Sequence, residues 1–128
     1  MNAPVANSDP ATYVAAVLTL YVELPETPLR TGVQDQWRAR RWHDLGVSLR
    51  VVESAFLLGS LRRLLRPADA PPLSPIRSLA YFQPVLDELI ANPPPDNYLD
   101  YLRLKLRRLT ARKAVPAGVQ KNTFSDDR

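Results

Sequence analysis

Cysteine is absent from this chain of 128 residues, and histidine occurs once, as His43. The absence of cysteine excludes a disulfide framework, a thiolate nucleophile and a cysteine zinc site. One histidine cannot build a multi-histidine metal site. Only four glycines are present, and none belongs to a phosphate-binding loop or a Gly-x-Ser-x-Gly nucleophile elbow. We therefore expect no metal and no cofactor.

Paired catalytic side chains are missing as well. Asp87 and Glu88 are neighbours in the sequence, and on a helix their carboxylates would point about 100° apart, so they do not form an acid–base pair. We interpret His43, next to Asp44, as a feature of a helix C-terminus rather than as a base. We predict that the protein is not an enzyme.

A long apolar run is the third feature that the sequence lacks. The longest, residues 13–22, is about half of a membrane span and is interrupted by Thr19. Residues 1–12 contain Asp9 but no lysine or arginine, so the basic start of a signal peptide is missing. We expect a cytoplasmic protein without a membrane partner.

Proline, in contrast, is abundant, with thirteen residues that divide the chain into helical segments. The length suits one domain with a modest core. We predict an all-α fold, a compact bundle of four to five helices with proline-rich connections. The single helical domain is expected to cover residues 1–113, and the polar residues 114–128 are expected to form a disordered tail.

Capping residues predict a central helical pair within residues 31–65. Thr31 and Gln34 have the spacing of a capping box, which would begin the first helix. Gly46 suits a left-handed C-terminal cap, and Ser48 suits the N-cap of the second helix. The second helix should bury one face, formed by Val52, Ala55, Phe56 and Gly59.

The outer helices are also marked by local signals. Asp9-Pro10 combines an N-cap with proline at the first helical position and predicts a helix over residues 10–23. Asp96 is expected to cap a last helix over residues 97–112. The expected buried stripes are Val14, Val17, Leu18 and Tyr21 in the first of these helices and Leu99, Leu102, Leu106 and Leu109 in the last.

Between these helices, four prolines in residues 67–75 predict a semi-rigid, extended linker. Ser74-Pro75 repeats the N-cap and first-turn signature and predicts a helix over residues 76–91. Pro84 lies inside that helix and should either kink it or split it near Gln83, because proline removes a backbone hydrogen bond.

Positive charge is concentrated in two separate segments of this chain, whose net charge is +4. Residues 30–66 contain eight arginines against three acidic residues, and residues 98–113 contain six basic residues against Asp100. Two basic segments in one small domain suggest a polyanion partner, and we expect them to meet as one continuous cationic surface. The alternative is that the arginines cover apolar surface with their stems.

Nucleic acid, most of all DNA, is the first interpretation of this charge pattern. Basic side chains neutralise phosphates, and tyrosines stack on the bases of single strands. The expected contacts are Arg38, Arg40, Arg41, Arg103, Lys105, Arg107, Arg108 and Arg112 for phosphates, and Tyr98 and Tyr101 for bases. The competing interpretation is that both tyrosines pack on the core and the cations are simply solvated.

A resemblance to a known family points the same way. Residues 49–65, followed by Ser78-Leu-Ala-Tyr-Phe-Gln-Pro-Val-Leu-Asp-Glu-Leu89, resemble the DnaD-like domain of bacterial and phage replisome organisers. Tyr81 and Val85 match the first two positions of the family's spaced motif, and Leu89 stands where the family has tryptophan. The resemblance covers about residues 32–90. It implies DNA binding near the tyrosine motif and the basic tail, and contacts with other replication proteins.

The alternative function is that of a protein–protein adaptor or a small subunit of a larger complex, without nucleic-acid contact. Trp and Tyr dominate interface hot spots, so an apolar docking surface is expected to consist of Trp37, Phe56, Tyr81 and Phe82. The simpler interpretation places all four in the core. Self-association is left open.

Two further interpretations are less favoured. The spacing around Gly46 matches a helix-turn-helix, but Leu49 and Glu53 are poor readers of base edges, so an ordinary helical hairpin is preferred. The last helix is basic and amphipathic, which is typical of membrane-surface helices, but its leucine stripe is better explained by core packing.

Overall fold

The computed structural model describes residues 9–114. This part of the chain contains helices and no β-strand, so the predicted all-α fold is confirmed. Of the predicted tail, 114–128, only Ala114 lies within the described residues, as the end of the last helix. The elements are α1 (Pro10–Val22), α2 (Val33–Asp44), α3 (Leu49–Leu64), the short 3-10 helix η2 (Leu79–Phe82), α4 (Gln83–Ala91) and α5 (Tyr98–Ala114).

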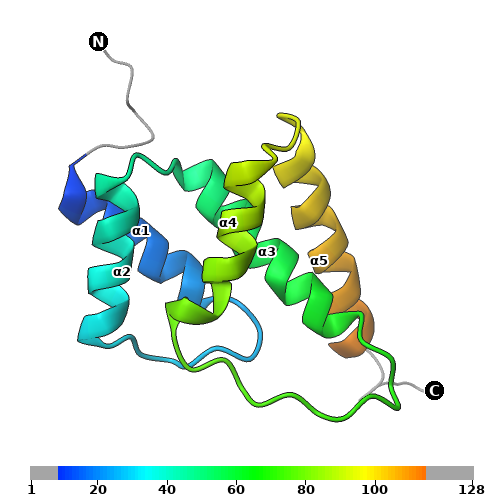
Figure 1. Ribbon diagram of the computed structural model, residues 1–128. Helices are drawn as coiled ribbons and strands as arrows, with labels where there is room; N and C mark the ends of the chain where they lie inside the picture. Colours follow the sequence, from blue (N-terminus) through cyan, green and yellow to red (C-terminus); the bar gives the residue numbers. More distant parts are fainter. Residues whose placement is uncertain (1–8, 115–128) are drawn as a thin grey trace.

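Helix α3 is the centre of the bundle. It contacts α1, α4 and α5, whereas α2 packs on α1 and reaches η2 (Figure 1). Because it has neighbours on several sides, α3 buries most of its surface, including the predicted face. Its buried residues are Val52, Ser54, Ala55, Phe56, Leu57, Gly59, Ser60 and Leu61.

An aromatic cluster fills the space between α1, α2, α3 and η2. The ring of Phe56 lies 5.0 Å from that of Phe82, 6.1 Å from that of Tyr21 and 6.2 Å from that of Trp42, measured between centroids. Gly59 permits this packing, because a Cβ at that position would lie 2.8 Å from the ring of Phe82. The cluster fixes how α2 and η2 dock on the central helix.

Helix α1 buries a stripe that differs from the predicted one. Tyr13, Val17 and Tyr21 are fully buried at four-residue spacing, whereas Val14 and Leu18 are only partly buried. The Tyr13 hydroxyl donates a hydrogen bond of 2.8 Å to the Val47 carbonyl, and this bond joins α1 to the turn after α2. Burial raises the pKa of both Tyr13 and Tyr21 to about 12.

Of the caps predicted for the first three helices, three are confirmed and one is wrong. Asp9 and Ser48 accept the expected backbone hydrogen bonds at the starts of α1 and α3, and Gly46 has φ 80° after α2. Helix α2, however, begins from Gly32 and not from a Thr31–Gln34 box. The carboxylate of Asp35 accepts hydrogen bonds from the Gly32 N–H and the Leu79 N–H, each at 3.0 Å. Asp35 is buried and ties the start of α2 to the start of η2.

The helix predicted over residues 76–91 is split. Ser78, and not Ser74, caps the 3-10 helix η2, and α4 begins at Gln83 with Pro84 in its first turn. Proline is tolerated there because the first amides of a helix have no intrahelical partner. Of the two outcomes expected at Pro84, the structure therefore shows the split and not the kink.

Helix α5 confirms the last predicted helix with slightly shifted ends. Leu99 and Leu102 are buried against α3, and Leu106 and Leu109 are partly buried, so the predicted stripe is correct.

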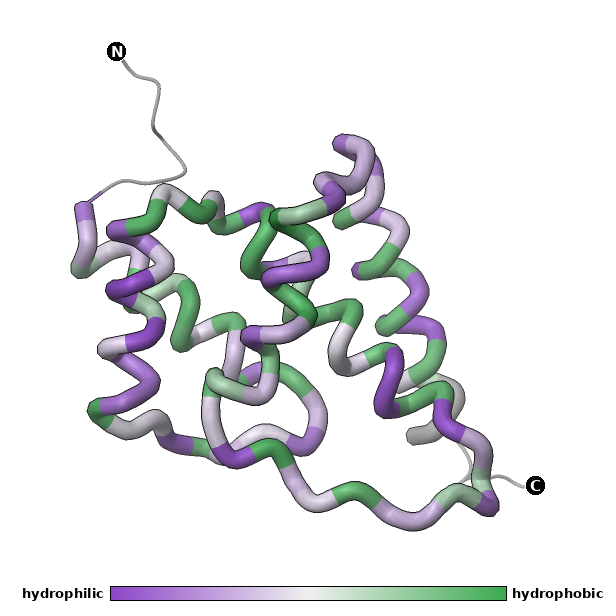
Figure 2. Tube along the Cα trace, viewed as in Figure 1, coloured by the Kyte–Doolittle hydropathy of each residue, from purple (hydrophilic) through white to green (hydrophobic). Residues whose placement is uncertain are grey.

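Figure 2 shows hydrophilic residues along most of α2, in contrast to the hydrophobic residues that recur along α3. The core thus lies around α3, and α2 and α5 present their polar faces outward.

Candidate functional site

The arginines of α2 and the cations of α5 do not meet in space, although α3, which also belongs to the first basic segment, packs on α5. Helices α2 and α5 lie at opposite edges of the bundle, with α3 and α4 between them (Figure 1). The expectation of one continuous cationic surface is therefore wrong. Its physical reason is that α2 docks on α1 and α5 docks on α3, so each basic helix turns its outer face to a different side. The two outer faces must be considered separately.

The outer face of α2 forms an open groove of about 590 Å³. Helix α2 buries Asp35, Ala39 and Trp42, and the opposite side therefore faces solvent. Trp37 is 72% exposed and Leu45 is 64% exposed. We call this surface the α2 groove; its lining consists of Gln34, Trp37, Arg38, Arg40, Arg41, Asp44 and Leu45.

The three arginines of the α2 groove differ in their partners. Arg38 donates a 2.9 Å hydrogen bond to the Gln83 side-chain oxygen, and Arg40 pairs with Asp44 at 3.1 Å. Arg41 is exposed, and its side chain has no hydrogen bond or ion pair within residues 9–114. A hydrogen bond from Arg40, and then one from His43, lowers the pKa of Asp44. With three arginines and one carboxylate, the α2 groove carries excess positive charge.

The outer face of α5 combines tyrosines with cations. The rings of Tyr98 and Tyr101 are stacked with centroids 6.2 Å apart, and Lys105 Nζ lies 5.9 Å from the Tyr101 centroid. Arg107 and Arg108 are exposed, and neither has a carboxylate partner among the described residues. We call this surface the α5 face; it consists of Tyr101, Lys105, Arg107 and Arg108 and is bordered by Tyr98, which is partly buried and packs against the core. Arg112 belongs to α5, but its side chain lies outside those that the structure describes.

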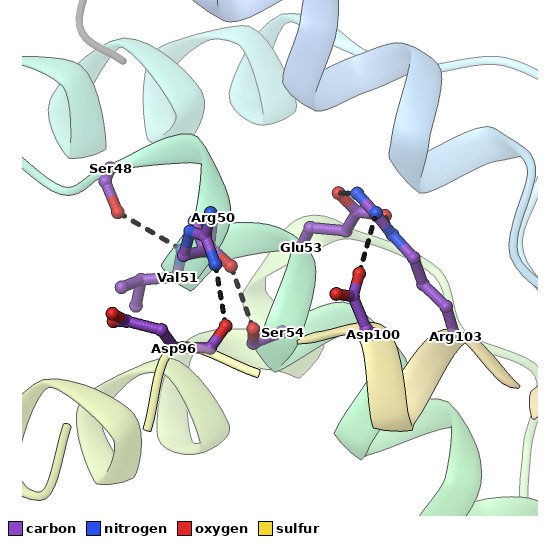
Figure 3. A network of polar contacts seen from close by, with 8 residues as sticks. All are labelled: Ser48, Arg50, Val51, Glu53, Ser54, Asp96, Asp100 and Arg103. Carbon is purple, nitrogen blue, oxygen red and sulfur yellow. Dashed lines mark hydrogen bonds and ion pairs between the residues drawn. The ribbon is translucent and has the colours of Figure 1, made fainter. Parts of the chain in front are cut away.

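Arg103, a predicted phosphate contact, is instead engaged with carboxylates (Figure 3). Two of its nitrogens donate to the two oxygens of Glu53, at 2.9 and 2.7 Å, and a third lies 3.5 Å from Asp100. The hydrogen bonds with Glu53 raise the pKa of Arg103. This bidentate pair joins α5 to α3, so Arg103 holds the bundle together and is not free for a phosphate.

A second contact in Figure 3 also serves the bundle. Arg50 donates a 2.8 Å hydrogen bond to the Asp96 carbonyl, and the Ser54 hydroxyl donates one of 2.9 Å to the Arg50 carbonyl. The loop before α5 is thereby fixed to the start of α3. Part of the positive charge of residues 30–66 is thus used to join helices.

The four predicted docking residues do not share a surface. Phe56 and Phe82 are buried in the aromatic cluster, at 1% and 0% exposure, so burial excludes them from a docking face. Trp37 is exposed on α2, and Tyr81 is 40% exposed in η2, where the Arg63 guanidinium lies 5.3 Å from its ring centroid. Sequence reasoning missed Leu45, whose place two helical turns beyond Trp37 was the available signal.

The described residues hold no group of three or more His, Cys, Asp or Glu side chains that could bind a metal ion. No helix within the same residues is long and apolar enough to cross a membrane. No family model, curated protein or solved structure matches this chain. The resemblance to DnaD-like domains therefore stays a prediction, and the α2 groove and the α5 face are the two candidate sites.

Proposed function

We propose that this protein is an interaction module that binds an acidic, partly apolar segment of a partner protein in the α2 groove. The observation that carries the proposal is Trp37, which is 72% exposed at a groove rimmed by arginines. Covering most of a tryptophan surface of roughly 200 Å² gives on the order of 3 kcal/mol at about 25 cal/mol per Å². Tryptophan and arginine are also the residue types that dominate interface hot spots.

The charge of the α2 groove determines the chemistry of the partner. Arg41 has no partner of its own within the described chain, and Arg38 reaches the groove while it holds Gln83. A carboxylate beside Arg41 would form a new charge-assisted hydrogen bond without breaking an existing one. An aromatic or aliphatic side chain next to that carboxylate would cover Trp37 and Leu45.

A peptide-display selection tests the proposal. Wild-type protein is the bait, and the enriched peptides are then titrated against the wild type and its variants. We expect enriched peptides with Asp or Glu beside an aromatic or aliphatic residue, and a loss of affinity of at least tenfold with Trp37→Ala or Arg41→Glu. Tyr101→Ala is the matched control, because it removes an exposed aromatic ring from the α5 face. Enrichment of neutral or basic peptides, or equal binding to the Trp37→Ala variant, would reject the proposal.

A second candidate function is the binding of single-stranded nucleic acid by the α5 face. The observation that favours it is that Lys105 lies beside Tyr101, whose ring stacks on Tyr98, and that Lys105, Arg107 and Arg108 on the same helix have no carboxylate partner in the described structure. Each phosphate contact contributes about −0.7 to the slope of log affinity against log salt, so three contacts predict a slope of about −2. A more specific version of this second candidate is the replisome-organiser role, which the family resemblance implies.

Fluorescence anisotropy with a labelled single-stranded oligonucleotide at 50 and 200 mM salt tests this second function. We expect the triple variant Lys105→Glu, Arg107→Glu, Arg108→Glu to abolish binding and Arg41→Glu to leave it within twofold. Equal losses with both variants would require a surface that includes α2. No binding at 50 mM salt would reject nucleic acid as a partner.

A further inference from the structure

The segment between α3 and η2 runs in an extended path along one edge of the bundle (Figure 1). Its two ends are held against the domain, and the residues between them are exposed. Ala70 is partly buried and Ile76 is 3% exposed, so these two residues face the domain, whereas Leu73 between them is 43% exposed. Residues 71, 72, 74, 75 and 77 are all exposed. An extended segment that is rich in proline and lies outside the helices is typical of a polyproline II helix.

Two arginines and one acidic residue hold this segment in place. The Arg63 side chain is 5% exposed, pairs with Glu26 and donates a 2.9 Å hydrogen bond to the Ser74 carbonyl. Arg66 donates a hydrogen bond to the Pro71 carbonyl. The Glu26 carbonyl accepts one of 3.1 Å from the Ile76 N–H. These contacts reach the segment from the domain side, and they leave its outward edges uncovered.

The outward edges carry a Pro-x-x-Pro-x-Arg sequence, Pro72-Leu-Ser-Pro75-Ile-Arg77. With three residues per turn, Pro72 and Pro75 share one edge, and Arg77 lies on the neighbouring edge. Arg77 is exposed and has no carboxylate partner within residues 9–114. Ile76, the residue between the second proline and the arginine, is buried in the domain and serves as the anchor.

We propose that residues 71–77 are a ligand for a proline-recognition domain with an aromatic groove and a carboxylate at one end, as in domains of the SH3 type. Such grooves bind Pro-x-x-Pro sequences, because a preformed polyproline II helix loses little entropy on binding. We call the exposed side of residues 71–77 the proline ridge. The carboxylate would pair with Arg77. The contacts of Arg63, Arg66 and Glu26 with the backbone of this segment hold the proline ridge in place before binding, which reduces the entropic cost of binding further. This surface is separate from both the α2 groove and the α5 face.

Titration of the full chain with an SH3 domain selective for Pro-x-x-Pro-x-Arg peptides tests the proposal. We expect a dissociation constant in the micromolar range. Pro72→Ala with Pro75→Ala should weaken binding at least tenfold, and Arg77→Glu at least fivefold. The matched controls are Pro93→Ala with Pro94→Ala, in the other proline run of the chain, and Arg107→Glu; both should bind within twofold of wild type.

A synthetic peptide of residues 68–79 completes the experiment. We expect it to bind several-fold more weakly than the full chain, because the contacts to Glu26, Arg63 and Arg66 are absent from it. Binding of the peptide but not of the chain would show that the domain masks the ridge and would overturn the proposal. Absence of binding by the chain at 1 mM, or binding that survives the double proline variant with an unchanged thermal midpoint, would overturn it as well.

Discussion

The outer faces of α2 and α5 are alike in composition and different in construction. Each has an exposed aromatic ring, Trp37 or Tyr101, among basic side chains. In the α2 groove one arginine is paired with an aspartate and another holds a glutamine, and Leu45 adds apolar surface. On the α5 face Lys105 lies beside Tyr101, whose ring stacks on Tyr98, and no acidic side chain pairs with Lys105, Arg107 or Arg108 in the described structure.

The difference shows that the count of arginines in a segment does not predict its partner. Arg50, Arg62, Arg63 and Arg103 all bond to side chains or carbonyls of other elements, so they join parts of the bundle. Among the other cations, those of α2 and those of α5 lie on two separate faces. One face suits a partner with both apolar and acidic groups, and the other suits a chain of phosphates. Four predictions test this division.

The largest effect should separate the two tryptophans of α2. Trp42 is 1% exposed, contacts Phe56 and donates a 3.0 Å hydrogen bond to Gln83, so Trp42→Ala should lower the free energy of unfolding by about 3–5 kcal/mol. Trp37→Ala should change it by less than about 0.5 kcal/mol, because the side chain is exposed. Urea unfolding measures both. A large loss of stability with Trp37→Ala would mean that Trp37 is part of the fold and not of a binding groove.

The next effect concerns the buried carboxylate that positions α2. Asp35→Asn replaces one carboxylate oxygen by an NH2 group. This group is a donor and would face the N–H donor of either Gly32 or Leu79, so one hydrogen bond is lost. We expect a loss of about 2 kcal/mol, because hydrogen bonds to charged groups contribute more than neutral ones. Gln36→Glu is an exposed control on the same helix and should stay within about 0.5 kcal/mol. Thermal unfolding followed by circular dichroism at neutral pH checks both, and equal stability of Asp35→Asn and wild type would contradict the assigned role.

The helix caps and the buried carboxylate of Asp35 show how far sequence reasoning reaches. The caps at Asp9, Gly46 and Ser48 were predicted because each satisfies backbone groups within a few residues of itself. Asp35 was missed as an anchor because one of its partners, the Leu79 N–H, lies 44 residues away. Its spacing with Ala39 and Trp42 was a usable signal, since residues four and three apart share a helix face.

The candidate sites depended even more on tertiary packing. Phe56 and Trp37 are both aromatic residues on helices, but only the docking of α2 and η2 on α3 decides that the first is buried and the second exposed. The same holds for Ser74 and Ser78, which both precede plausible helix starts. Ile76 is buried in the core, and the next helix therefore begins only after Ser78. Sequence alone therefore predicted the elements well and the surfaces poorly.

A smaller effect should distinguish the bonded arginine of α5 from the free ones. Arg103→Ala removes the bidentate bond to Glu53, whose side chain is 18% exposed, and we expect a loss of about 1 kcal/mol. Arg107→Ala should change stability by less than about 0.5 kcal/mol but weaken oligonucleotide binding. Chemical unfolding and anisotropy on the same two variants give the comparison. If Arg107→Ala destabilised the bundle more than Arg103→Ala, the assignment of the two roles would be reversed.

The smallest effect is the pH dependence contributed by Asp44, the only carboxylate that lines the α2 groove. Its pKa is lowered from 3.8 by the hydrogen bonds from Arg40 and His43, so the folded state binds a proton less readily than the unfolded chain. The stabilisation is therefore present above the unfolded pKa and is lost as the pH falls through the folded pKa. Asp44→Asn should flatten the acid limb of the stability curve below about pH 4 and leave stability near neutral pH almost unchanged, because exposed pairs contribute little. The same variant should increase the affinity of the α2 groove for acidic peptides at neutral pH, since it removes the one negative charge there. Weaker binding by Asp44→Asn would show that Asp44 orients Arg40 for the partner rather than opposing it.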